Sequence, residues 1–200
     1  MDAVPNPPLA VLFGILFAIA GPIKSMPTFQ VLSAGMEVRV RNMLAIKACA
    51  LGALAIALAV LMVDAMAKKY AVSSPAIGSA AGLMLLVVGV LSLLGKESGP
   101  PPTSPIDAMG LAFPVLLPPY AFGLILLFAV SLPTAAMGLI TLGAALMAMN
   151  AVAMIFADAV LKRVGMAPLR LLGAIFGILQ VALGMQILFW GIAEGFGFSN

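Results

Sequence analysis

Long apolar runs separated by short polar loops make up most of this sequence. Hydrophobic residues form 64% of the 200 residues and charged residues only 8%, against about 25% charged in an ordinary soluble domain. A helix needs about 20 apolar residues to cross the hydrocarbon core of a bilayer. The chain therefore predicts an all-α polytopic membrane protein with six transmembrane helices. We expect the spans at Leu9–Ser33, Met43–Val63, Pro75–Gly95, Ala108–Val130, Pro133–Ala157 and Pro168–Ile192.

The first apolar run is interrupted by Gly21-Pro22-Ile23-Lys24-Ser25-Met26-Pro27. Proline lacks an amide N–H and clashes with the preceding turn, and glycine adds backbone freedom, so this stretch predicts a broken helix at membrane depth. Such a break is tolerated inside the protein or beside a water-filled cavity. Lys24 adds a charge there, at a cost of about 2.5–3.5 kcal/mol near the bilayer centre on insertion scales. A broken helix with a charge is the first place to look for a solute site.

The second half of the chain repeats features of the first. The proline-rich loop Lys96–Asp107 separates two halves, residues 1–99 and residues 100–200, with three runs each. Because three is an odd number, the second half must insert upside down, which predicts one membrane domain of two inverted repeats with broken first and fourth helices. A proline pair recurs at a shift of 92 residues and a glycine triplet at a shift of 95: Pro22 and Pro27 with Pro114 and Pro119, and Gly78, Gly82 and Gly89 with Gly173, Gly177 and Gly184.

The Lys and Arg residues are divided unequally between the two sides of the predicted bundle. The loops after the first, third and fifth spans, with the helix ends beside them, carry seven, and the opposite side carries only Lys68 and Lys69. Because Lys and Arg gather in cytoplasmic loops, we expect both termini on the non-cytoplasmic side. The stretch before Leu9 has no Lys or Arg, so we expect the first run to be retained rather than cleaved as a signal peptide.

Two pairs of small residues predict close helix contacts. Gly78 and Gly82 lie four residues apart in the third run, and Gly173 and Gly177 lie four apart in the sixth. Glycines at this spacing clear one helix face, so that another backbone can approach. We expect these four glycines to pack the helices together.

The residue types present exclude several classes of function. The chain has no histidine and a single cysteine, Cys49, so we expect no metal, no cofactor and no paired-thiol chemistry. No nucleophile stands beside a visible base and no two carboxylates share a span, which argues against an enzyme. The small net charge of +3 lies mostly in loops, so nucleic acid is not an expected partner. No acidic residue lies in the middle of a span, which argues against a carboxylate proton relay.

The first run resembles that of the MarC family of six-span bacterial inner-membrane proteins, also called the small neutral amino acid transporter family. That family carries Asn-Pro-x-Gly-Asn-x-Pro in its first segment. Both prolines are kept here as Pro22 and Pro27, while Gly21, Lys24 and Ser25 replace the Asn, Gly and Asn. The resemblance extends over nearly the whole chain.

The fourth and sixth runs are also similar to this family. Its fourth segment reads Pro-Leu-x-x-Pro-Leu-Leu-x-Gly-Pro-Gly, of which Pro114 and Pro119 are kept here. Pro118 and Tyr120 stand where the family has the glycines that flank the last proline. In the sixth run, the Arg-x-x-Gly opening corresponds to Arg170 and Gly173, and the close of the segment to Gln186 and Gly191.

The resemblance implies a bacterial inner-membrane transporter or exporter of small solutes, with neutral amino acids as the substrate class. A zwitterion needs partners for a carboxylate and an ammonium. Helices that restart after Pro27 and Pro119 offer N–H groups and a positive dipole end for the carboxylate. The exposed carbonyls before each break are acceptors for the ammonium. The candidate solute-binding residues are Gly21, Pro22, Lys24, Ser25, Pro27, Thr28, Pro114, Pro119 and Tyr120.

Each of these assignments has an alternative. The prolines could serve only as helix kinks, and Lys24 could snorkel to water or plug the break rather than contact a solute. Interhelical hydrogen bonding is the expected role of Asn150, Gln180 and Gln186. The alternative function is that of a transport-inactive accessory or structural subunit of a larger membrane complex. The expected partners are the lipid bilayer, a small solute, and either further copies of the chain or that complex.

Overall fold

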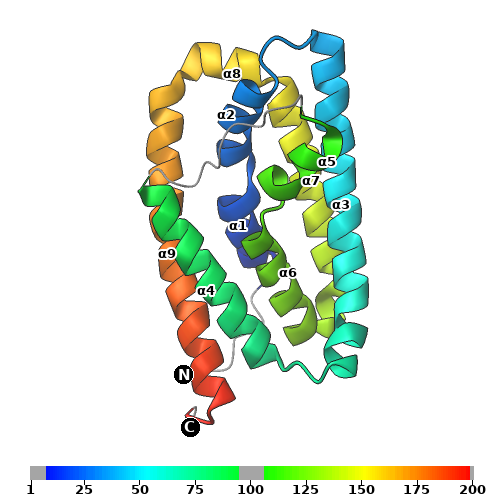
Figure 1. Cartoon of the computed structure of the whole chain (residues 1–200), viewed down its shortest axis with the longest axis vertical. Helices are drawn as coiled ribbons and strands as arrows, with labels where there is room; N and C mark the ends of the chain where they lie inside the picture. Colours follow the sequence, from blue (N-terminus) through cyan, green and yellow to red (C-terminus); the bar gives the residue numbers. More distant parts are fainter. Residues whose placement is uncertain (1–7, 95–105, 199–200) are drawn as a thin grey trace.

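A computed structural model describes residues 8–94 and 106–198, and these residues form helices and no strands. The predicted all-α polytopic fold is confirmed (Figure 1). The expected loop Lys96–Asp107 lies almost entirely outside the described residues. The helices are α1 (Leu9–Ala20), α2 (Pro22–Leu32), α3 (Val38–Lys69), α4 (Ser74–Leu93), α5 (Ala108–Gly110), the π-helix η1 (Leu111–Leu116), α6 (Pro119–Ser131), the 3₁₀ helix η2 (Pro133–Ala135), α7 (Ala136–Ile155), α8 (Ala157–Val164) and α9 (Met166–Gly195).

The described helices give five or six spans. Five stretches are long and apolar enough to cross a membrane, and α1 with α2 counts as one of them. The sixth is the pair Ala108–Leu116 and Pro119–Ser131, which is bent by 69° at its break. The first break lies at Gly21 alone, and Pro27 stays inside α2. The expectation of a break from Pro22 to Pro27 is therefore wrong, because Pro22 occupies the first helical turn, where no N–H is needed.

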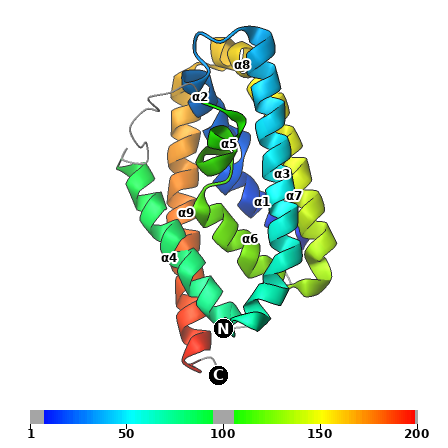
Figure 2. The same ribbon diagram turned by 45° about the vertical axis from the view of Figure 1, so that its right-hand side comes forward.

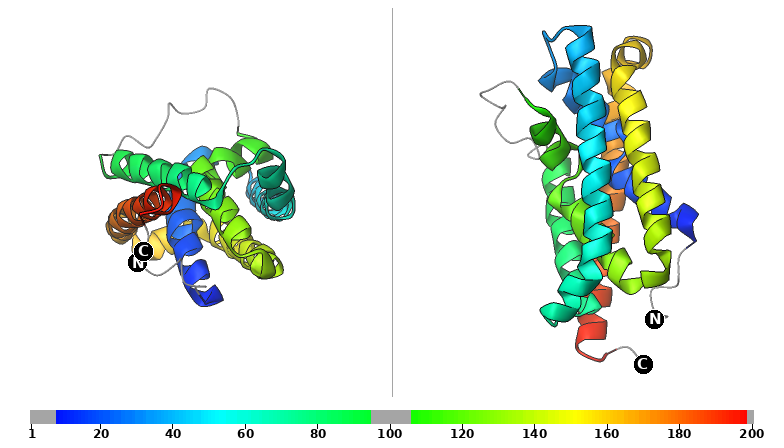
Figure 3. Two further views of the ribbon diagram at one scale, coloured as in Figure 1. Left: turned by 90° about the horizontal axis from the view of Figure 1, so that it is seen from below. Right: turned by 90° about the vertical axis from the view of Figure 1, so that its right-hand side faces the viewer.

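The broken first segment lies in the middle of the bundle. Helix α1 contacts α7 on one side and α9 on the other (Figure 3), and α2 contacts α7, α9 and η1. Its apolar side chains are among the most deeply buried: Leu12, Leu16 and Ile19 of α1 are at most 2% exposed, and Phe29 of α2 is fully buried. Burial of this segment on several sides is what makes an interrupted helix tolerable at membrane depth.

Helices α4 and α9 form the closest pair and run side by side in opposite directions (Figure 2). Their backbones touch at glycine: a Cβ on Gly82 would lie 2.4 Å from the Leu188 amide nitrogen and 2.7 Å from the Gly184 carbonyl oxygen. A Cβ on Gly78 would meet the Trp190 ring, and one on Gly177 would meet Leu93. Among the residues that the structure describes, no heavy atom lies within 4 Å of a Cβ on Gly173, so its expected packing role stays a prediction. Gly173 lies one turn before Gly177, whose neighbour Leu93 is the last residue of α4.

Helix α8 crosses one end of the bundle between α7 and α9 (Figure 1). The sequence predicts a loop for this stretch, because it lies between the fifth and sixth apolar runs. We call this the α8 end. The α2–α3 connection lies at the α8 end too, and the α3–α4 and α6–α7 connections lie at the opposite end.

Candidate functional site

The first break is formed by one extended residue. Gly21 has φ −82° and ψ 173°, so the α1 hydrogen-bond ladder stops at Ala20 and α2 starts at Pro22. Pro22 has no N–H to donate back to α1, which leaves carbonyls of the last α1 turn without a partner in their own helix. A Cβ at position 21 would lie 2.1 Å from the Phe17 carbonyl oxygen. Only glycine fits where the chain approaches the α1 backbone so closely.

Asn150 of α7 takes up the hydrogen-bonding groups that the break exposes. Its amide nitrogen donates to the Ala20 carbonyl oxygen at 2.9 Å and to the Leu146 carbonyl oxygen at 3.0 Å. Its side-chain oxygen accepts from the Ser25 hydroxyl at 2.6 Å. Asn150 is fully buried and Ser25 is 3% exposed. The predicted interhelical hydrogen bonding by Asn150 is confirmed, and it joins both sides of the break to α7.

Lys24 lies in the first turn of α2, and its side chain reaches toward α9. The ammonium nitrogen donates to the Gln180 side-chain oxygen at 2.7 Å, and the Gln180 amide donates to the Leu85 carbonyl oxygen of α4 at 3.4 Å. Gln180 is only 2% exposed. The expected role of Gln180 is confirmed, whereas Gln186 is exposed on α9 and forms no hydrogen bond within the described part of the chain. The half-buried Lys24 side chain therefore crosses from the break to α9.

The second break is longer and sharper than the first. Phe113 (φ −131°, ψ 126°) and Leu117 (φ −121°, ψ 80°) are both non-helical, and Pro118 is extended before α6 begins at Pro119. Pro118 and Pro119 follow Pro114 in this stretch, and all three prolines lack the N–H groups that would continue a helix. α2 contacts η1 and α1 contacts α6, so the two broken segments lie against each other within the bundle.

The structure separates the candidate residues into an inner and an outer group. Gly21, Pro22, Ser25 and Tyr120 are buried between helices. Lys24 and Pro27 are half-buried, whereas Thr28 is exposed and donates back to the Lys24 carbonyl oxygen at 3.2 Å. Pro114 and Pro119 are exposed as well. Asn150 and Gln180 also belong to the inner group. In the sequence, each stands out as an isolated amide side chain within an apolar run.

Two cavities lie away from the breaks. One, of about 330 Å³, lies between α3, α4 and α6, and the other, of about 440 Å³, lies between the start of α1 and η2. Neither is lined by residues 21–28 or 114–120. In the described part of the chain no three His, Cys, Asp or Glu side chains are grouped as metal ligands. The inner group therefore consists of backbone carbonyls, amides and hydroxyls that bond to one another, with the Lys24 ammonium bonded to it at Gln180.

Comparison with known proteins adds the family. The model of the MarC family integral membrane proteins matches residues 8–196. The chain belongs to the MarC family. No curated protein and no solved structure matches it. The MarC match covers both breaks and all of the helices, which agrees with the resemblance in the proline-containing segments.

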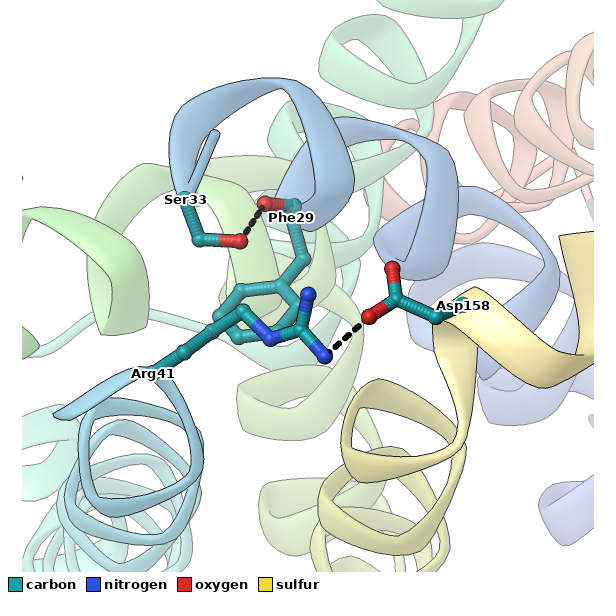
Figure 4. Close-up of polar contacts among 4 residues, drawn as sticks. All are labelled: Phe29, Ser33, Arg41 and Asp158. Carbon is teal, nitrogen blue, oxygen red and sulfur yellow. Dashed lines mark hydrogen bonds and ion pairs between the residues drawn. The ribbon is translucent and has the colours of Figure 1, made fainter. Parts of the chain in front are cut away.

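The α8 end of this MarC protein is held by an ion pair between its two halves. The Arg41 guanidinium of α3 pairs with the Asp158 carboxylate of α8, and beside it the hydroxyl of Ser33, which caps the end of α2, donates to the Phe29 carbonyl oxygen (Figure 4). Arg41 is 12% exposed and Asp158 36%. Hydrogen bonds from Arg41 and then Gln30 hold the pKa of Asp158 below its usual value. Helix α8 is thereby fixed to the start of α3 and the end of α2.

Acid is expected to release this contact. Because the pKa of Asp158 is lowered in the folded state, its stabilisation is present above the unfolded value of about 3.9 and is lost as pH falls through the folded value. A partly exposed pair contributes at most about 1 kcal/mol, or about 2–4 °C in melting temperature for a chain of this size. Thermal unfolding in detergent should show a larger loss between pH 6 and pH 3 in the wild type than in Asp158→Asn.

The control for this prediction is Asp64→Asn. Asp64 pairs with Lys68 at 2.7 Å on an exposed stretch of α3, and both side chains are at least half exposed. Its removal should leave the acid-induced loss of the wild type unchanged. Equal acid sensitivity of Asp158→Asn and the wild type would mean that the Arg41–Asp158 pair does not stabilise the fold.

Proposed function

We propose that this MarC protein is a secondary transporter or exporter of small solutes, with its site between the breaks of α1–α2 and η1–α6. The observation that carries the proposal is that α2 and α6 both restart after a break, at the buried Pro22 and the exposed Pro119, in two broken segments that contact each other. Helix N-termini at membrane depth are typical of transporter sites for anionic groups, and broken-helix carbonyls are typical of cation sites.

Neutral amino acids are the substrate class that this arrangement supports best. The N–H groups at the start of α2 and α6 suit a carboxylate. The Ala20 carbonyl oxygen accepts a hydrogen bond from the Asn150 amide. When that bond breaks, the same oxygen can accept from the ammonium of the solute. Ser25 and Tyr120 add hydroxyl groups. A bound solute would therefore replace hydrogen bonds that the protein forms within itself when no solute is bound. The polar groups at the break then have hydrogen-bond partners with and without solute.

The orientation and the symmetry are part of the same proposal. We place the α8 end in the cytoplasm of a bacterial inner membrane, because Arg39, Arg41, Lys162 and Arg163 lie at this end and Lys and Arg favour the cytoplasmic side. Both termini are then periplasmic. Two inverted repeats, residues 1–99 and 100–200, would rock about the breaks to give alternating access. In this proposal the protein lies in the lipid bilayer, and its protein partners are further copies of the chain or a larger membrane complex.

A transport-inactive accessory subunit is the second candidate. The observation that favours it is the plug at the first break, where Lys24 is bonded to Gln180 and Asn150 occupies the Ala20 carbonyl. A site held closed by its own side chains is also what a purely structural relative would show. The two candidates differ in whether water and solute ever reach Ser25.

Thiol labelling separates the two. In a Cys49→Ala background, Ser25→Cys is expected to react with a water-soluble thiol reagent in proteoliposomes, because transport opens the break. Excess alanine or glycine should slow this reaction severalfold. Ser33→Cys is the matched control: Ser33 is a buried serine, 2% exposed, directly after α2 at the α8 end. Its reaction should not depend on solute.

The labelling experiment can also reject transport at this site. If Ser25→Cys of a folded protein stays unreactive and no small solute changes this, the break is sealed. The accessory-subunit function would then be the better account.

A further inference from the structure

An apolar groove runs along the outer side of α3 at the end opposite α8. Its floor is formed by the buried Val63 and Ala67, and exposed side chains such as Leu58, Met62 and Met66 form its open edge. Ile77 of α4 and Leu126 of α6 close the other side. The cavity measures about 330 Å³ and is lined by Leu58, Ala59, Met62, Val63, Met66, Ala67, Tyr70, Val72, Ile77 and Leu126. No side chain of the inner group at the breaks reaches it.

The shape of this groove fits a single hydrocarbon chain. Ala59, Val63, Met66 and Tyr70 follow one another at helical spacing on one face of α3, so the groove extends about 16 Å along the axis at about 1.5 Å per residue. That length matches one leaflet, which is half of a hydrocarbon core of about 30 Å. The groove is open to the outside along this length, so an extended acyl chain can lie in it from the membrane side.

The mouth of the groove carries a cation that pairs with no acidic side chain of the described residues. Lys68 pairs with Asp64 at 2.7 Å. Lys69 instead lies over the ring of Tyr70, 5.8 Å from its centre, and has no ion pair with any residue that the structure describes. Tyr70 lines the groove, so the Lys69 ammonium stands at its entrance. Tyrosine and lysine at the end of a span mark the level of the lipid headgroups.

We propose that this groove is a binding site for an anionic phospholipid, with one acyl chain along α3 and the phosphate at Lys69. The groove supplies an apolar surface one leaflet deep, and the charge at its mouth selects the headgroup. Tyr70 completes the site at the interface, where an amphipathic ring contacts both chain and headgroup. The site does not depend on transport, because it lies outside the broken segments.

Native mass spectrometry of the detergent-purified protein tests this site with two lipids of identical acyl chains, phosphatidylglycerol and phosphatidylcholine. The wild type is expected to retain phosphatidylglycerol about tenfold more strongly, and Lys69→Gln should remove this preference. Lys47→Gln is the matched control, because it removes the same charge from the exposed face of α3 near the α8 end. It should keep the preference.

A second variant tests the acyl-chain part of the site. Ala59 lines the inner end of the groove, so Ala59→Phe should fill it and lower the retention of both lipids severalfold without changing the melting temperature by more than a few degrees. Equal retention of both lipids by the wild type would overturn the proposal. So would an unchanged preference in Lys69→Gln, or an oligomer that covers this face and excludes lipid.

Discussion

Replacing Gly82 by leucine is expected to prevent this protein from reaching a stable fold. A Cβ at this position would lie 2.4 Å from the Leu188 nitrogen, 2.7 Å from the Gly184 oxygen and 2.8 Å from the Leu188 Cα. All three are backbone atoms, so no rotamer change relieves the contact. Helices α4 and α9 would have to separate along most of their shared length, which is the largest helix contact of the bundle.

A graded series makes this prediction quantitative. Gly82→Ala adds only the Cβ, and overpacking of this kind costs about 1–3 kcal/mol, or about 2–4 °C for each kcal/mol in a chain of this size. Gly82→Leu should lose the monodisperse folded protein altogether. Gly173→Leu is the matched control, because a Cβ at Gly173 meets no heavy atom of the described residues within 4 Å. It should purify and melt like the wild type.

Thermal unfolding and size-exclusion chromatography in detergent measure the series. A folded Gly82→Leu protein with an unchanged melting temperature would show that α4 and α9 do not make the contact described here. If Gly173→Leu lost the folded protein as completely as Gly82→Leu, the predicted difference in packing between these two glycines would be wrong.

The outline of the fold follows from the sequence, because a bilayer allows few solutions. Six apolar runs predict the spans, and their bounds agree with the helices to within a few residues, apart from the longer ends of α3 and α9. Helix α8 was missed because a short amphipathic helix at the surface leaves no apolar run. Whether the two halves form inverted repeats stays a prediction.

The candidate site was predictable only in part, since packing decides which residues meet. Gly21 and Pro22 mark the first break from the chain alone, and the structure moves its end from Pro27 back to Pro22. Asn150 stood out as a lone amide in an apolar run, but its partner, the Ala20 carbonyl, is 130 residues away. Similarly, the repeat pattern paired Gly78 and Gly82 with Gly173 and Gly177. The residues that meet Gly82 are Gly184 and Leu188.

Shortening Lys24 is expected to open the solute path. The hydrogen bond from its ammonium to Gln180, 2.7 Å long, must break before a solute can enter between the break and α9. A hydrogen bond to a charged group contributes about 1.5–3 kcal/mol, and each 1.4 kcal/mol is a factor of about ten. Lys24→Gly removes both this bond and the volume of the side chain. We therefore predict that it raises uptake of alanine or glycine by about tenfold or more over a weak or absent wild-type rate.

Lys24→Met separates the two contributions, since methionine keeps much of the length and loses the charge. If bulk obstructs the path, Met should transport little better than Lys, and if the charged hydrogen bond holds it closed, Met should transport nearly as well as Gly. Lys47→Met serves as the control for the loss of a lysine, because Lys47 is exposed on α3. Each variant must first show the wild-type melting temperature to within a few degrees.

Uptake of radiolabelled alanine and glycine into proteoliposomes, compared between the wild type, Lys24→Gly and Lys24→Met, is the most direct test of a solute site at the first break. The site described here predicts weak or absent wild-type uptake that Lys24→Gly raises. Strong wild-type uptake that Lys24→Gly abolishes would contradict it and make Lys24 a substrate ligand. Absence of uptake in every folded variant would contradict transport itself and favour the accessory-subunit function.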